Sequence, residues 1–130
     1  MWRILVVEDS PTNMLLTVEI LGFAGHLALE ATTGVEGLDS ARREQPDIIL
    51  MDLHLPDMDG IEVTRRLKAD PLTRDIPVIA VTASVRAGEG KPLLDAGFDG
   101  YIGKPISYKA FLAEVNAAVL RRRGERPPTN

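Results

Sequence analysis

Five side chains that could carry chemistry stand at the ends of short apolar runs of the chain. Glu8 and Asp9 follow the first run, Asp52 follows a second, and Thr82 and Lys104 follow two more. If these runs are parallel β-strands, their carboxyl ends meet at one edge of a sheet, where ligands bind in open α/β folds. We therefore expect three carboxylates, a hydroxyl and an ammonium group to gather in one cleft.

Such a gathering of charges predicts a metal site. Carboxylates that lie together repel each other, and the pKa of one of them rises unless a cation joins the group. Lys104 supplies one positive charge, which does not balance Glu8, Asp9 and Asp52. A hard divalent cation with oxygen ligands completes the balance, and Mg²⁺ suits a site that has few protein ligands and keeps several waters.

The elements that must position these side chains centre on Ile48–Met51. This run is short, bounded and rich in β-branched residues, which is typical of a buried strand. A proline and an Asp-Gly pair follow within the next eight residues after Asp52 and force a loop. Asp52 is therefore expected at the carboxyl end of a buried strand, directly before a loop.

Strand-like and helix-like stretches alternate along the whole chain. The expected strands are Arg3–Val7, Leu27–Glu30, Ile48–Met51, Pro77–Val81 and Gly100–Gly103. The expected helices start after a Ser10 cap, at Thr33-Gly34, after an Asp59 cap, after Thr82-Ala83-Ser84 and after a Ser107 cap. The fourth of these helices is expected to end at Gly97. This pattern predicts the α/β class, with a doubly wound parallel sheet, helices on both faces and right-handed crossovers.

Three of the helices carry more detailed expectations. In the second, Val35, Leu38 and Ala41 are expected to point inward. In the third, Arg65, Arg66 and Lys68 are expected to form a solvated face. In the fourth, Gly88, Gly90 and Pro92 interrupt the first half, so we expect that helix to begin late or to form loosely.

Composition limits the class of protein. The 130 residues are 45% hydrophobic and 26% charged, which predicts one domain with a core, placed at residues 1–120, and a polar, disordered tail at residues 121–130. The net charge of -4 argues against direct DNA binding. The chain has no cysteine, no apolar run as long as a membrane span and no signal-peptide pattern after Met1, so we expect a cytoplasmic protein without a membrane partner.

Four motifs stand in order, each at the end of an expected strand. They are Val7-Glu8-Asp9, the stretch Met51-Asp52-Leu53-His54-Leu55-Pro56-Asp57-Met58-Asp59-Gly60, Val81-Thr82-Ala83, and Tyr101-Ile102-Gly103-Lys104-Pro105. Together they make residues 3–120 resemble the CheY-like receiver domain of two-component response regulators. The motif sequences are similar to those of single-domain receivers and of the receivers of hybrid histidine kinases. The resemblance implies a flavodoxin-like (βα)5 fold with strand order 2-1-3-4-5.

The resemblance also implies a role for each site residue. Asp52 is the phosphoacceptor, which takes a phosphoryl group from a phosphohistidine of a histidine kinase or histidine phosphotransfer protein. Mg²⁺ is bound by Asp9, Asp52, the backbone carbonyl of His54 and, through a water, Glu8. The phosphoryl group is bound by Thr82, Ala83 and Lys104, and the switch residues are Thr82 and Tyr101.

By the same resemblance, the protein is a signalling domain rather than an enzyme, with weak self-dephosphorylation. Its output face is formed by the fourth helix, the fifth strand and the fifth helix, and it controls a downstream protein. The sequence leaves open whether that control is exerted as a shuttle in a phosphorelay or as an allosteric regulator of a kinase or motor.

Other functions fit the residues less well. A haloacid-dehalogenase-type phosphatase needs a second acid two residues after its nucleophile, where this chain has His54. A flavin or dinucleotide site needs a glycine-rich or hydroxyl-rich loop after the first strand, where Glu8 and Asp9 would repel a phosphate. A receiver that never takes phosphate would be expected to lack at least one member of the residue set.

Overall fold

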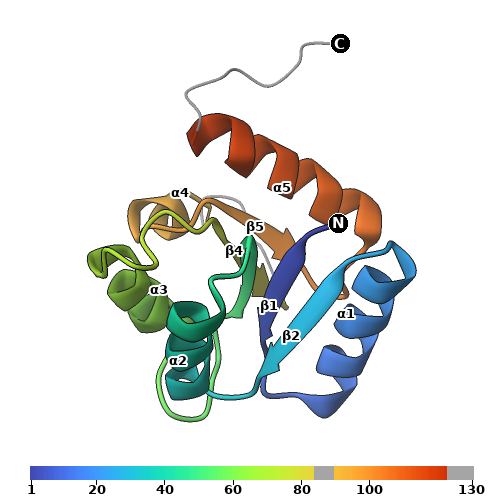
Figure 1. Ribbon diagram of the computed structural model, residues 1–130, viewed down its shortest axis with the longest axis horizontal. Helices are drawn as coiled ribbons and strands as arrows, with labels where there is room; N and C mark the ends of the chain where they lie inside the picture. The colour runs from blue at the N-terminus through green and yellow to red at the C-terminus, as the bar shows by residue number, and fades with distance from the viewer. Residues whose placement is uncertain (84–89, 123–130) are drawn as a thin grey trace.

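A five-stranded parallel sheet forms the centre of the molecule in the computed structural model, which describes residues 1–83 and 90–122 (Figure 1). The strands lie in the order β2-β1-β3-β4-β5, so the α/β class and the implied strand order are confirmed. Their bounds are β1 Arg3–Val7, β2 Leu27–Ala31, β3 Ile48–Asp52, β4 Val78–Thr82 and β5 Gly100–Gly103.

Helices cover both faces of the sheet (Figure 1). Their bounds are α1 Pro11–Phe23, α2 Gly34–Glu44, α3 Gly60–Ala69, α4 Gly90–Asp95 and α5 Tyr108–Arg122. Buried residues of α1 and α5 pack against one face of the sheet, and those of α2, α3 and α4 pack against the other. No helix among the described residues is both long enough and apolar enough to cross a bilayer.

Two predicted segments extend beyond the described residues. Of the residues expected to interrupt the fourth helix, Gly88 lies outside the described residues, whereas Gly90 and Pro92 lie within the described α4, which begins at Gly90. The helix α5 continues to Arg122, two residues into the segment expected as a tail, and residues 123–130 also lie outside. The boundary at residue 120 stays a prediction.

Four helices start where the sequence predicted. Backbone N–H groups donate to the side chains of Ser10, Thr33, Asp59 and Ser107, each of which stands directly before the first residue of a helix. These oxygens satisfy N–H groups that have no partner within the helix, and such a cap contributes about 1 kcal/mol. Capping therefore fixes the residue at which each of these helices begins.

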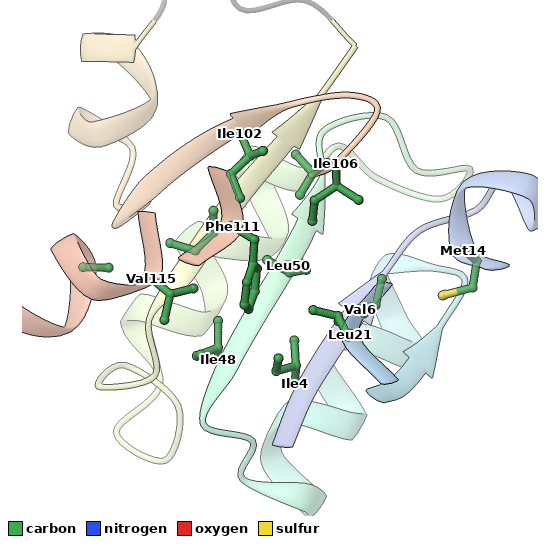
Figure 2. Packing of buried hydrophobic residues seen from close by; sticks show 13 residues of the cluster. Ile4, Val6, Met14, Leu21, Ile48, Leu50, Ile102, Ile106, Phe111 and Val115 are labelled. Carbon is green, nitrogen blue, oxygen red and sulfur yellow. The ribbon is translucent and has the colours of Figure 1, made fainter. Parts of the chain in front are cut away.

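The strands β1 and β3 are buried on both faces. Ile4, Ile48 and Leu50 point toward Phe111 and Val115 of α5 (Figure 2), while alternate residues of the same strands belong to the opposite cluster. Each fully buried aliphatic side chain contributes about 1.5–3 kcal/mol relative to an exposed one. The backbone that carries Glu8 and Asp52 is therefore held rigidly between two apolar layers.

Two expectations about helix surfaces were wrong. Val35 is 60% exposed, because α2 buries Gly34, Gly37 and Ala41 instead. A Cβ atom added at Gly37 would lie 3.0 Å from the Val7 side chain, so α2 approaches β1 too closely for a larger residue on that face.

Lys68 is also not part of a solvated face, although Arg65 and Arg66 are exposed. Its Nζ lies 2.9 Å from Asp99 and donates to the carbonyl of Ile76 at 2.9 Å. This ion pair joins α3 to the segments that lead into β4 and β5, at the end of the sheet opposite Asp52.

A cluster of aromatic side chains packs at the amino end of β1. The indole of Trp2 stacks on His26 with ring centroids 5.1 Å apart, and the backbone N–H of Trp2 donates to His26 Nδ1 at 3.1 Å. Tyr108 and Phe111 of α5 lie against the same imidazole. Burial and the nearby N-terminal ammonium lower the pKa of His26.

Gly60 marks the closest backbone approach near Asp52. A Cβ atom added there would lie 2.2 Å from the Asp52 carbonyl oxygen, well inside van der Waals contact. The Gly60 N–H donates to the carbonyl of Leu53 at 2.9 Å, which closes the loop between β3 and α3. A side chain at this position would push the loop away from the strand end.

Gly60→Ala is therefore expected to lower the free energy of unfolding by about 3 kcal/mol or more, because backbone atoms cannot move aside as a flexible side chain can. Urea unfolding followed by circular dichroism measures the change. Gly22→Ala is the control, since no atom lies within 4 Å of its added Cβ, and it should be neutral or stabilising. Equal urea midpoints for the wild type and Gly60→Ala would contradict the close approach.

His26 is expected to make stability depend on pH. The unfolded chain binds a proton at His26 near its ordinary pKa of 6.5, whereas the folded chain resists it, so acid favours unfolding. The difference in urea midpoint between the wild type and His26→Gln should shrink as the pH falls from about 7.5 to about 5.5. A difference that stays constant over this range would show that His26 protonates equally well in both states.

Candidate functional site

The predicted site residues come together at the carboxyl edge of the sheet. Glu8 and Asp9 follow β1, and Asp52 ends β3. Carboxylate oxygens of these three residues all lie within 4.8 Å of one another. The sequence-based expectation of a carboxylate cluster at one strand edge is therefore confirmed, because parallel strands bring the same ends together.

Lys104 reaches this cluster from the end of β5. Its Nζ lies 2.7 Å from Glu8 Oε1 and 3.5 Å from Asp52 Oδ1. The Glu8 and Asp52 side chains are only 5% and 6% exposed, and that of Lys104 is 17% exposed, so these charges interact with little water between them. Backbone hydrogen bonding fixes the lysine, because its N–H donates to the Thr82 carbonyl at 2.8 Å.

The electrostatics of the cluster leave negative charge in excess. Burial raises the pKa of Glu8, and its hydrogen bond with Asp52 raises it further, while Lys104 opposes both effects. Asp9 is exposed and adds a third carboxylate at the mouth of the site. The excess negative charge and the carboxylate oxygens both suit a hard divalent cation, so this cluster could bind a metal ion.

The loop between β3 and α3, residues 53–59, shapes one wall of the site. The His54 N–H donates to Asp52 Oδ1 at 3.2 Å, and His54 pairs with Asp59 in an isolated antiparallel bridge. The His54 side chain is exposed, so a contribution from this residue would come through its backbone. The loop is thus folded back on itself beside the aspartate.

The remaining predicted residues lie along β4 and β5. Thr82 is buried at the end of β4, and the small residue Ala83 next to it is exposed. Tyr101 is half-buried on β5 and packs against the cluster formed by α2, α3 and α4. A hydroxyl, an open position and an aromatic ring therefore stand on the Lys104 side of the site.

The sequence did not indicate the contacts of one residue in the loop that follows Asp52. Asp57, at the tip of the loop, accepts hydrogen bonds from the N–H groups of Gly34 at 2.7 Å and Val35 at 2.9 Å. These two bonds lower the pKa of Asp57. Its position between Pro56 and Met58 indicated a loop, but nothing in the sequence indicated that its partner would be the start of α2.

Comparison with protein families gives a match over most of the chain. The model of the response regulator receiver domain matches residues 4–116. The polar-differentiation response regulator DivK of Brucella ovis is 40% identical over 114 residues, which cover 88% of this chain and 93% of that protein.

Solved structures agree with the family match. A response regulator from Chloroflexus aurantiacus superimposes with a TM-score of 0.84 at 27% identity, covering 92% of this chain and 98% of its own. The receiver domain of the sensor histidine kinase PA1611 from Pseudomonas aeruginosa, which has a magnesium ion coordinated in its active site cleft, superimposes with a TM-score of 0.77 at 34% identity. That match covers 95% of this chain and 98% of the other. The chain therefore belongs to the receiver domain family of two-component response regulators, and its role is that of a phosphoacceptor in signalling.

Proposed function

We propose that Asp52 is the residue that accepts the phosphoryl group. The observation that carries this proposal is the placement of its carboxylate at the end of β3, with Lys104 Nζ 3.5 Å away and Glu8 and Asp9 beside it. An Asp52 oxygen attacks the phosphorus of a phosphohistidine, the new O–P bond forms, and the P–N bond breaks. The electron pair of that bond stays on the imidazole of the donor.

The residues around Asp52 supply positioning and charge rather than covalent chemistry, which suits phosphoryl transfer. Lys104 neutralises charge on the phosphoryl oxygens, and the Thr82 hydroxyl donates to one of them. Ala83 leaves the phosphorus open to the donor because its side chain is small. The Glu8–Lys104 contact at 2.7 Å keeps the ammonium group in reach.

We further propose that the metal is Mg²⁺, held by Asp9, Asp52 and the His54 carbonyl, with Glu8 acting through a water. When bound, the ion would neutralise charge on the transferring phosphoryl group. The acidic cluster and the magnesium in the cleft of the Pseudomonas aeruginosa receiver support this assignment.

Phosphorylation would be read out on the α4–β5–α5 face. The added charge of roughly -1.5 to -2 draws Thr82 toward the phosphoryl group, and Tyr101 turns into the space that Thr82 leaves. Phosphorylation, like the binding of a ligand, would shift the population between two existing conformations. The phosphodonor would be a histidine kinase or histidine phosphotransfer protein in the cytoplasm. The target of the output face would be a downstream protein. The phosphorylated protein would dephosphorylate itself only weakly.

Acetyl phosphate tests the phosphoacceptor directly. Wild-type protein should gain one phosphoryl group in intact mass spectrometry when Mg²⁺ is present, and far less when EDTA replaces it. Asp52→Asn should gain none, because an amide is not a competent nucleophile.

Asp39→Asn provides the matched control, since it removes an exposed carboxylate of α2 that pairs with Arg43. It should be phosphorylated like the wild type. Phosphorylation of Asp52→Asn at the wild-type rate, or a wild-type reaction indifferent to Mg²⁺, would refute the proposal.

Asp52→Asn should also stabilise the metal-free fold. Burial raises the pKa of Glu8, and Asp52 raises it further. Removing the Asp52 carboxylate relieves the second effect, so the free energy of unfolding should increase by about 1 kcal/mol. Adding Mg²⁺ to 100 times its dissociation constant should stabilise the wild type by about 2.7 kcal/mol and the variant by less. Urea titrations with and without Mg²⁺ measure both effects, and an equal Mg²⁺ response in the two proteins would place the metal elsewhere.

A further inference from the structure

The loop between β3 and α3 is closed at its base, and its tip makes an outside contact with the start of α2. At the base, the Gly60 N–H donates to the Leu53 carbonyl at 2.9 Å, and His54 pairs with Asp59. The tip, around Asp57, extends away from these bonds toward the start of α2. Leu55 and Met58 of the loop also pack against the apolar cluster that includes residues of α2 and α3, and the polar contact at the tip adds to that packing.

Asp57 supplies that outside contact with both carboxylate oxygens. Oδ1 accepts from the Gly34 N–H at 2.7 Å and Oδ2 from the Val35 N–H at 2.9 Å. These are the first two N–H groups of α2, which have no carbonyl partner within the helix, and the helix dipole favours an anion there. Two charge-assisted bonds from one carboxylate fix its orientation as well as its distance.

The helix α2 does not depend on Asp57 for its cap. The Glu36 N–H donates to Thr33 Oγ1 at 3.1 Å, and the Glu36 carboxylate returns to accept from the Thr32 N–H at 2.8 Å. This reciprocal arrangement within residues 32–36 already caps the helix. The Asp57 bonds are additional, and they join α2 to a different part of the chain.

The start of α2 is a firm anchor because it is tied to the strand that carries Glu8. Gly37 packs against Val7, with only 3.0 Å between its added Cβ and that side chain. The Glu8 N–H donates to the Ala31 carbonyl at the end of β2, three residues before α2 begins. Asp57 therefore connects the Glu8 side of the site, through α2, to the loop that carries His54.

We propose that Asp57 is a positioning residue for phosphoryl transfer, which fixes the loop carrying the His54 carbonyl by binding the N-terminus of α2. The inference rests on the proposed function, in which that carbonyl is a ligand of Mg²⁺. Groups that orient metal ligands without touching the metal change affinity by about 10–100-fold when they are removed. Asp57 acts in this way from the far side of the loop.

The first test measures Mg²⁺ affinity by titrating MgCl₂ into labelled protein and following backbone amide signals by NMR. Asp57→Ala, which removes both acceptors, should raise the dissociation constant about tenfold. Asp57→Asn, which keeps the shape and one acceptor, should raise it by less. The rate of phosphorylation by acetyl phosphate at low Mg²⁺ should fall in the same order and recover as the Mg²⁺ concentration is raised.

The second test uses the reciprocity of linked equilibria. If the Asp57 contact strengthens Mg²⁺ binding about tenfold, Mg²⁺ must strengthen the contact by the same factor. Hydrogen exchange of the Gly34 and Val35 amides in the wild type should therefore slow by up to about tenfold when Mg²⁺ is added. In Asp57→Ala, which has no acceptor for these amides, the slowing should be lost, and in Asp57→Asn it should be smaller than in the wild type.

Thr33→Ala is the matched control, because it removes the cap of α2 and leaves the Asp57 carboxylate in place. It should lower stability while Mg²⁺ affinity stays within about twofold of the wild type. The inference is overturned if Asp57→Ala binds Mg²⁺ as tightly as the wild type, or if Thr33→Ala weakens binding equally. A wild type that neither binds Mg²⁺ nor takes phosphate would instead overturn the proposed function, and the inference with it.

Discussion

Three carboxylates share the carboxyl edge of the sheet with one ammonium group, and this imbalance of charge shapes the rest of the molecule. Lys104 lies 2.7 Å from Glu8, yet burial and Asp52 still raise the pKa of Glu8. A group of like charges held this closely costs free energy, which the fold must offset elsewhere. The same imbalance is what makes this edge of the sheet suited to bind a divalent cation.

The offset comes from the strands that carry the charges. Alternate residues of β1 and β3 enter the two apolar clusters, so both strands are packed on each face up to the residue before Glu8 and up to Asp52 itself. Such packing allows little backbone movement. Gly60 extends this rigidity into the loop, because its missing side chain lets the loop lie directly against the Asp52 carbonyl. The carboxylates of the site therefore repel one another, while the backbone that carries them is held in place.

Most of the fold and the central site could be predicted because the deciding signals are local. The apolar run before Asp52, and the caps Ser10, Asp59 and Ser107, each specify an element without reference to the rest of the chain. Val35 and Lys68 were mispredicted because their surroundings depend on how closely α2 approaches β1 and on where Asp99 returns to the sheet. The partner of Asp57 is likewise set by tertiary packing, since 22 and 23 residues separate it from the amides it binds.

The proposed mechanism requires that Asp52, and none of the other carboxylates of the cluster, carries the phosphoryl group. Reduction of the phosphorylated protein with sodium borohydride converts an acyl phosphate to an alcohol, and peptide mass spectrometry locates the converted residue. Homoserine is expected at position 52 alone, and only after phosphorylation in the presence of Mg²⁺. Conversion at Glu8 or Asp9, with Asp52 intact, would contradict it.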